Sequence, residues 1–156
     1  MKQLRRWLIA LAMLIALAGT ALAQARGNAD EAKQMVQDAL AYVKQAGTDK
    51  AFEDFTTATP GSRWHKKDLI VFCYKFDGTC VCNGNNKALM GKNLLEFKYP
   101  DGHTRIKEMV DIVKSKGNGA IEYSWPDPIT KKIGIKQAFV SRIPGYDGFL
   151  AVGIYK

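Results

Sequence analysis

Apolar residues recur with helical spacing in the stretch between Asn28 and Gly47. They fall on one face over three turns, at Ala32, Met35, Val36, Ala39, Leu40 and Val43. Asn28 followed three residues later by Glu31 has the spacing of a capping box, and Gly47 is a typical residue at a helix end. The pattern therefore predicts a long N-terminal helix, with a shorter helical piece over Asp49–Phe55 after it.

Short runs rich in β-branched and aromatic residues predict the strands. The first run is Leu69–Phe76, and Asp77-Gly78 follows it with the two positive-φ positions that a type I′ hairpin turn needs. A return strand is expected directly after that turn. Three further runs are separated by segments with turn chemistry, and they cover about Ala120–Trp125, Lys136–Ile143 and Phe149–Tyr155.

A second clear helix is predicted between the hairpin and these later strands, from about His103 to Lys116. Its apolar positions are Ile106, Met109, Val110 and Val113. The polar stretch over Asn83–Asp101 reads as a long loop that leads into it. The order of elements predicts an α+β fold, with a five-stranded antiparallel sheet and helices on one face or one end of it.

The first 23 residues have the three parts of a secretory signal peptide. A basic start precedes the apolar stretch Leu8–Leu17, and Ala21-Leu22-Ala23 is a small-x-small cleavage site. A retained membrane anchor is the alternative, although the apolar stretch is short for a bilayer span. We therefore expect an exported, periplasmic protein with a single domain over residues 29–155 and no transmembrane span after cleavage.

The formal net charge of +8 is partly due to this N-terminal segment. Without Lys2, Arg5 and Arg6 the chain has 20 basic and 15 acidic side chains, a balance of +5 with the charges interspersed. Export makes nucleic acid an unexpected partner. A modest positive balance favours anionic ligands or anionic membrane surfaces.

Three cysteines would enter an oxidising compartment, and their odd number leaves at least one unpaired. If Asp77 and Gly78 are the two loop residues, Cys73 faces Cys82 at a non-hydrogen-bonded position, where a disulfide is geometrically reasonable. Cys80 would then lie on the same face as Cys82. The alternative is a thiol-based redox or metal-handling protein that uses all three, but a lone C-x-C is a poor ligand set, so we predict no metal and no cofactor.

Signatures of enzymes are absent from the sequence, which contains no G-x-S-x-G, P-loop, G-x-G-x-x-G or H-E-x-x-H motif. The carboxylates are scattered singly among lysines. We therefore predict that the protein is not an enzyme.

Residues suited to binding are better represented. Trp64, Tyr123 and Trp125 are amphipathic aromatics near strand ends or loops, and such residues can wall a small concave site. Tyr123 and Trp125 have the same strand parity and point to the same face of the sheet. Lys136 begins the next strand and could neutralise a ligand carboxylate, whereas core packing and solvent exposure are the alternative roles.

Taken in order, these segments resemble the single-Cache family of extracytoplasmic small-molecule sensor domains. The resemblance is carried by the hairpin around Asp77-Gly78, the turn Gly91-Lys92-Asn93-Leu94, the segment Tyr123-Ser-Trp125-Pro126 and Lys136, and it covers roughly residues 29–155. It implies a PAS-like sheet with the ligand held against it, under the loop that precedes the second helix. Tyr123, Trp125 and Lys136 become candidate ligand contacts, with Trp64 as a fourth.

The sequence departs from the family pattern at three positions. Ile70 stands where the family often has Tyr, Asn83 where a His often follows the second strand, and Lys87 where a proline is common. Asn83 can still donate and accept hydrogen bonds, so it is kept as a contact. The resemblance implies a module that binds and senses a small organic acid or related metabolite and acts through a separate membrane partner, a sensor kinase or a chemoreceptor.

Overall fold

The computed structural model describes residues 26–99, 101–127 and 129–156, so the predicted signal peptide lies outside the described residues. The helices are α2 (Ala29–Ala46), α3 (Thr48–Thr57) and α4 (Arg105–Lys116), with a short 3-10 turn, η1 (Lys87–Leu89). The strands are β1 (His65–Lys66), β2 (Leu69–Lys75), β3 (Cys80–Asn83), β4 (Asn118–Pro126), β5 (Ile133–Arg142) and β6 (Gly148–Tyr155). Within the described residues, no helix has the length and apolar character needed to cross a membrane.

The predicted capping box at the start of α2 is confirmed. The Glu31 N–H donates to Asn28 Oδ1 at 2.9 Å, and the Asn28 N–H donates to Glu31 Oε2 at 3.1 Å. These bonds satisfy two of the free N–H groups at the helix start. Gly47 ends the helix with a φ of 83°, a value that side chains other than glycine rarely adopt, and α3 follows at once.

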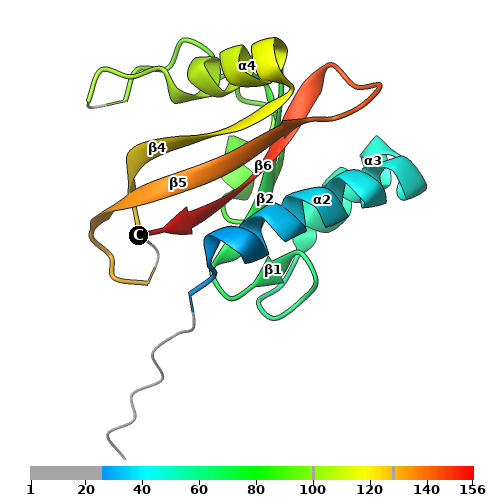
Figure 1. The fold of residues 1–156 in the computed structure, drawn as a ribbon, viewed down its shortest axis with the longest axis horizontal. Coiled ribbons are helices and arrows are strands. Elements are labelled where there is room, and N and C mark those ends of the chain that lie inside the picture. The colour runs from blue at the N-terminus through cyan, green and yellow to red at the C-terminus, as the bar shows by residue number, and fades with distance from the viewer. Residues whose placement is uncertain (1–25, 100, 128) are drawn as a thin grey trace, which may run out of the picture.

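The sheet has the strand order β1-β2-β6-β5-β4, and β3 also pairs with β2. All the pairings are antiparallel, which confirms the predicted antiparallel sheet, with the two-residue β1 as an additional strand. The last three strands form a meander, whereas β6 closes back onto β2 from the first half of the chain (Figure 1).

Helices cover both faces of the sheet, where one face or one end was predicted. Figure 1 shows α4 on one side of the strands and α2 with α3 on the other. The parity of β2 separates two cores: Leu69, Val71 and Cys73 pack with α2 and α3, whereas the alternate residues pack with α4. The β2 strand is buried on both faces, which explains its nearly continuous apolar sequence.

The β2–β3 hairpin does not have the predicted two-residue turn. The Lys75 N–H donates to the Thr79 carbonyl at 2.9 Å, so three residues form the loop, and of the Asp77-Gly78 pair only Gly78 has a positive φ. A bulge at Val81 then shifts the register, because Tyr74 faces Cys80 while Cys73 faces Cys82. The three-residue loop shifts the register of β3 by one residue, and the bulge shifts it back, so the predicted pairing of Cys73 with Cys82 is kept.

As a result, Cys73 and Cys82 lie opposite each other and are joined by a disulfide, with a Cα–Cα distance of 4.8 Å. The bulge places Cys80 on the other face of the sheet, contrary to the predicted shared face. There Cys80 is buried as a free thiol in the core beneath α4, away from the disulfide.

Candidate ligand-binding site

A cavity of about 660 Å³ lies between the sheet, α4 and the long segment that precedes α4. The sheet contributes Phe72 and Tyr74 from β2, and α4 contributes Ile106 and Met109. The segment over residues 85–99 supplies the outer wall. Most of the lining is aromatic or aliphatic, and a few polar groups reach into it, as is typical of small-molecule sites.

Four of the five predicted site residues line this cavity: Asn83, Tyr123, Trp125 and Lys136. The Tyr123 and Trp125 rings have centroids 6.1 Å apart in an edge-to-face arrangement, on the face that their strand parity predicts. Tyr123 is also paired directly with Lys136 across β4 and β5. The short β4–β5 connection therefore brings an aromatic wall and a cation together.

Lys136 is a buried cation in the cavity wall, and its side chain passes over Gly153 of β6. A Cβ atom at position 153 would lie 2.4 Å from Lys136 Cε, so the glycine provides the space for this lysine. Only 8% of Lys136 is exposed, and within the described residues no acidic group lies within ion-pair distance of its ammonium. Burial lowers the pKa of Lys136 to about 8, against a smaller opposing effect of the Asp68 carboxylate.

Arg105, at the start of α4, is a second buried cation in the same cavity. Its guanidinium pairs with Asp101 and lies 4.1 Å from the centroid of the Tyr99 ring and 5.1 Å from that of Tyr123. The Arg105 Nε is buried without a hydrogen-bond partner in the described structure. Cation–π contacts replace part of the lost hydration of the guanidinium, and the Nε–H is left as an unsatisfied donor.

Asn83 lies at the cavity but uses its side-chain oxygen elsewhere. Asn83 Oδ1 accepts hydrogen bonds from the backbone N–H groups of Asn85 at 3.0 Å and Asn86 at 2.8 Å. These bonds form the first turn of the segment that covers the cavity. Asn83 therefore shapes the outer wall, and its Nδ2 amino group is the part of the side chain that remains for a ligand.

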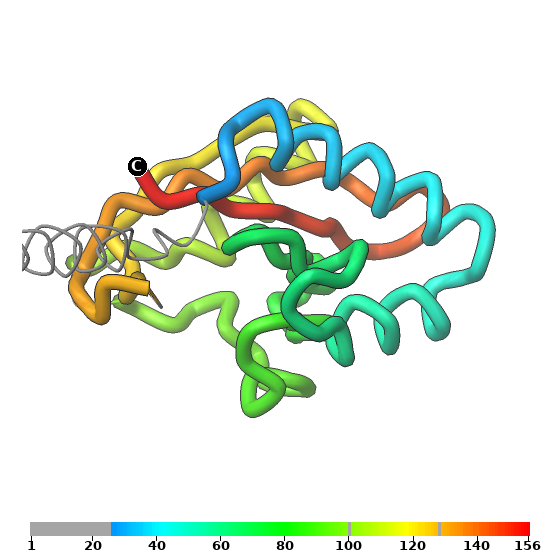
Figure 2. Tube along the Cα trace, turned by 90° about the horizontal axis from the view of Figure 1, so that it is seen from below, coloured from blue at the N-terminus to red at the C-terminus, as the bar shows by residue number. Residues whose placement is uncertain are grey.

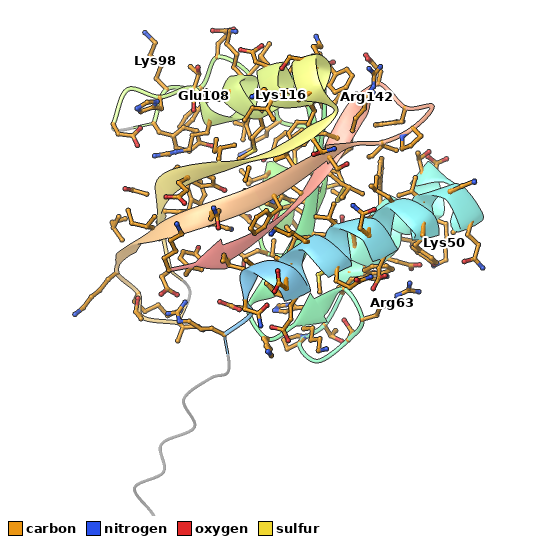
Figure 3. All side chains as sticks on the ribbon, in the orientation of Figure 1. Lys50, Arg63, Lys98, Glu108, Lys116 and Arg142 are labelled. Atoms are coloured by element: carbon orange, nitrogen blue, oxygen red, sulfur yellow. A yellow bond between two sulfur atoms is a disulfide. The ribbon has the colours of Figure 1, made fainter. Side chains whose placement is uncertain are left out.

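Trp64 does not line the cavity, contrary to the prediction. It is buried in the core on the opposite face of the sheet, where its ring meets Phe55 edge-on at 4.8 Å between centroids. The Arg63 guanidinium lies 4.3 Å from the centroid of the Trp64 ring, and Figure 3 shows Arg63 beside β1, on the side of the sheet away from α4. Trp64 closes the core beneath α2 and α3, because the chain reaches β1 on that side.

The sequence resembles known sensor proteins. Residues 61–156 match the sequence model of the Cache domain. The methyl-accepting chemotaxis protein McpP of Pseudomonas putida is 25% identical over 168 aligned positions, which cover 97% of this chain and 31% of that protein. The chain thus spans about a third of the length of this curated relative.

Solved structures show the same fold. A methyl-accepting chemotaxis protein from Vibrio parahaemolyticus RIMD 2210633 has a TM-score of 0.66 at 21% identity, with 81% of this chain and 86% of that chain covered. A Cache chemosensory domain described for its carboxylic acid recognition has a TM-score of 0.66 at 22% identity, with 81% and 91% covered. The chain belongs to the Cache family of extracytoplasmic sensor domains, as a ligand-sensing module of the single-Cache kind.

Proposed function

We propose that the cavity binds a small organic acid. The observation that carries this proposal is Lys136, a buried ammonium in the cavity wall with no acidic partner within ion-pair distance in the described structure. Burial of an uncompensated charge is costly, so a carboxylate that reached Lys136 would relieve an existing penalty. A related Cache domain is described for carboxylic acid recognition, which supports the same ligand class.

The other lining residues would fix the orientation of the acid. Tyr123 offers a hydroxyl beside Lys136, Trp125 offers a flat apolar wall, and the Asn83 amide group offers a donor at the mouth. The Arg105 Nε is a further donor for an acid that extends toward α4. An acid with a short apolar body fits this cavity, because the wall is largely apolar and its basic groups, such as Lys136 and Arg105, are separate from each other.

In this proposal, binding orders the described part of the segment from Asn83 to Asp101, of which residues 85–99 form the outer wall of the cavity. The altered surface is then read by a separate membrane partner, a chemoreceptor or a sensor kinase. The similarity to a region of the methyl-accepting chemotaxis protein McpP supports a role in signalling of this kind.

A thermal-shift screen tests the proposed ligand class. Short monocarboxylates and dicarboxylates are compared with their neutral amides and with amines of matching length, because a ligand that binds only the folded state raises the melting temperature. We expect acids alone to raise it, and the Lys136→Met variant to lose the effect. Lys116→Met is the matched control, since Lys116 is exposed on α4 (Figure 3). A flat response to every acid by well-folded protein would reject the proposal.

A further inference from the structure

Arg26 connects the start of α2 to the wall of the cavity. It precedes the helix by three residues, and its Nη2 donates to Asp127 Oδ2 at 2.5 Å. Asp127 lines the cavity and is 4% exposed, whereas Arg26 does not belong to the lining. A residue outside the cavity therefore neutralises a carboxylate inside its wall.

Asp127 remains ionised in this position. Burial opposes its ionisation more than any other single influence, but hydrogen bonds from Arg26, Ile129 and Thr130 together lower the pKa of Asp127 to about 2. The Ile129 N–H and the Thr130 hydroxyl each donate to it at 2.9 Å, so the carboxylate also organises the β4–β5 connection. Among the described residues, Arg26 is the one cation within ion-pair distance of this carboxylate, so release of Arg26 would leave the charge unbalanced.

The charges around the cavity give Arg26 a specific importance. The described lining residues include four basic side chains, of Lys92, Arg105, Lys131 and Lys136, and Asp127 is the only carboxylate among them. An unbalanced Asp127 would repel an anionic ligand and attract these same cations. The Coulomb interaction is large in a partly dehydrated wall, so one carboxylate matters for affinity.

Asp68 is a second carboxylate whose negative charge Arg26 offsets. Arg26 Nη1 lies 3.6 Å from Asp68 Oδ2, and both atoms are buried without a hydrogen bond. The charge of Asp68 acts on Lys136. Without Arg26, the Asp68 carboxylate would compete with a ligand for the Lys136 ammonium, while Asp127 would leave a negative charge in the cavity wall.

Two further contacts beside this ion pair hold the two ends of the described chain together. The Tyr155 hydroxyl donates to the Pro126 carbonyl at 2.7 Å, and the Arg26 guanidinium lies 5.8 Å from the centroid of the Tyr155 ring. Figures 1 and 2 both show the start of α2 near the end of β6. The β4–β5 connection thus links a wall of the cavity to the segment that enters α2.

We propose that Arg26 is a positioning residue for the cavity: by pairing with Asp127 it keeps the wall favourable to anions, and it thereby couples the start of α2 to occupancy of the cavity. The ligand part of this inference rests on the proposed binding of an organic acid. Coupling is reciprocal, so an acid in the cavity stabilises the Arg26 contact to the same extent as the contact stabilises the acid.

The contact itself is tested without any ligand, by limited trypsin digestion of the purified protein. Cleavage after Arg26 requires local release of its side chain. We expect Asp127→Asn to accelerate formation of the fragment that starts at Gly27 by about fivefold or more, a factor typical of coupled sites. Cleavage after Lys98 is the internal reference, and Asp111→Asn removes an exposed carboxylate as a control. Unchanged cleavage after Arg26 would overturn the inference.

The effect on the ligand is tested by titration calorimetry with propionate and its neutral analogue propionamide. We expect Arg26→Gln to weaken propionate binding by about tenfold with little effect on propionamide, and Arg26→Gln/Asp127→Asn to recover most of the loss. An equal loss for both probes, or no recovery in the double variant, would overturn the role of charge. If wild-type protein binds no organic acid, the proposed function fails, and the trypsin experiment still decides whether the contact exists.

Discussion

At the scale of single residues, Lys136 determines how the cavity responds to pH. Its pKa of about 8 means that the unliganded protein loses this charge in mildly alkaline solution. A bound carboxylate favours the charged form, so affinity for an acid is expected to fall by about tenfold per pH unit above pH 8. Calorimetry between pH 6.5 and 9.5 measures this. Affinity that stays constant over the range would show that Lys136 does not hold the acid.

The stability of the unliganded protein should change in the opposite direction. The pKa of Lys136 is lowered below the ordinary value of 10.5, so between pH 8 and about 10 the unfolded chain binds a proton that the folded protein lacks. The free energy of unfolding therefore rises with pH in this window. Above this window the trend reverses, because burial raises the pKa of Tyr155 to about 12. Between pH 10 and 12 the folded protein keeps a proton that the unfolded chain loses, so the free energy of unfolding falls as pH increases.

The Lys136→Met variant isolates this contribution. It is expected to lack the rise between pH 8 and 10, and to be at least as stable as wild type at pH 7, because methionine removes a buried uncompensated charge. Urea unfolding at several pH values provides the comparison, with Lys116→Met as the control. Identical pH profiles for wild type and Lys136→Met would contradict the assignment of the lowered pKa.

Cys80 gives a prediction that separates ligand binding from thiol chemistry. The residue is 1% exposed, and burial raises the pKa of its thiol. A buried thiol of this kind reacts slowly, so titration of native protein should detect no fast thiol. Unfolding should expose one thiol, and unfolding with reductant all three. A reactive thiol in the native protein would favour the redox alternative.

Strand parity explains which site residues could be inferred from the sequence. Tyr123 and Trp125 lie two positions apart on one strand, and Lys136 follows after a connection with turn chemistry, so their shared face could be deduced. Trp64 precedes a strand of only two residues, which gives no parity to use. Arg105 has a weaker signal in the sequence: it occupies the buried stripe of α4 beside Ile106, and a basic residue is unfavourable near a helix N-terminus.

At the scale of elements, the β2–β3 hairpin has the predicted pairing of Cys73 with Cys82, although its turn differs from the predicted one. Asp-Gly favours a two-residue turn, but the structure has a three-residue loop, and the bulge at Val81 restores the pairing of Cys73 with Cys82. Turn preference is weak compared with packing on both faces of β2. The location of a bulge depends on those tertiary contacts, so the face occupied by Cys80 could not be read from the spacing.

The tip of this hairpin also supports the outer wall of the cavity. A Cβ atom at Gly78 would lie 2.5 Å from Leu95 Cβ, whereas one at Gly61 would meet no atom within 4 Å, although both glycines have a similar positive φ. Either substitution by alanine should cost about 1 kcal/mol for the backbone conformation. Gly78→Ala should cost more, and it alone should weaken acid binding, because the Leu94 N–H bonded to the Gly78 carbonyl would have to move.

Urea unfolding and acid titration of Gly78→Ala and Gly61→Ala check this prediction. Gly61→Ala is the matched control, because its turn lies far along the chain from the cavity segment and shares only the backbone cost. If the two variants lose equal stability and retain equal affinity, the hairpin tip does not support the cavity wall.

At the scale of the whole molecule, the sheet separates two layers that have different roles. The order of elements along the chain was enough to predict an α+β fold, but not which helix covers which face. That depends on β6 inserting beside β2, a pairing between distant parts of the sequence. Local periodicity carries no information about such a pairing, whereas the family resemblance implied that the ligand lies under the loop before the second helix.

This division into layers predicts which segments will change their rate of hydrogen exchange when an acid binds. Hydrogen exchange should slow in the segment over residues 85–99, which covers the cavity, and in the β4–β5 connection, where Asp127 lies in the wall. The first turn of α2 should also be protected through Arg26, although it lies on the other face of the sheet. By contrast, α3 packs in the opposite core, and it meets the cavity segment at its last turn, where the Thr56 hydroxyl accepts a hydrogen bond from the Asn83 N–H at 3.3 Å. Exchange in the first turns of α3 should therefore be unchanged. Protection spread evenly over both layers would indicate general stabilisation, and would contradict a specific path through Arg26.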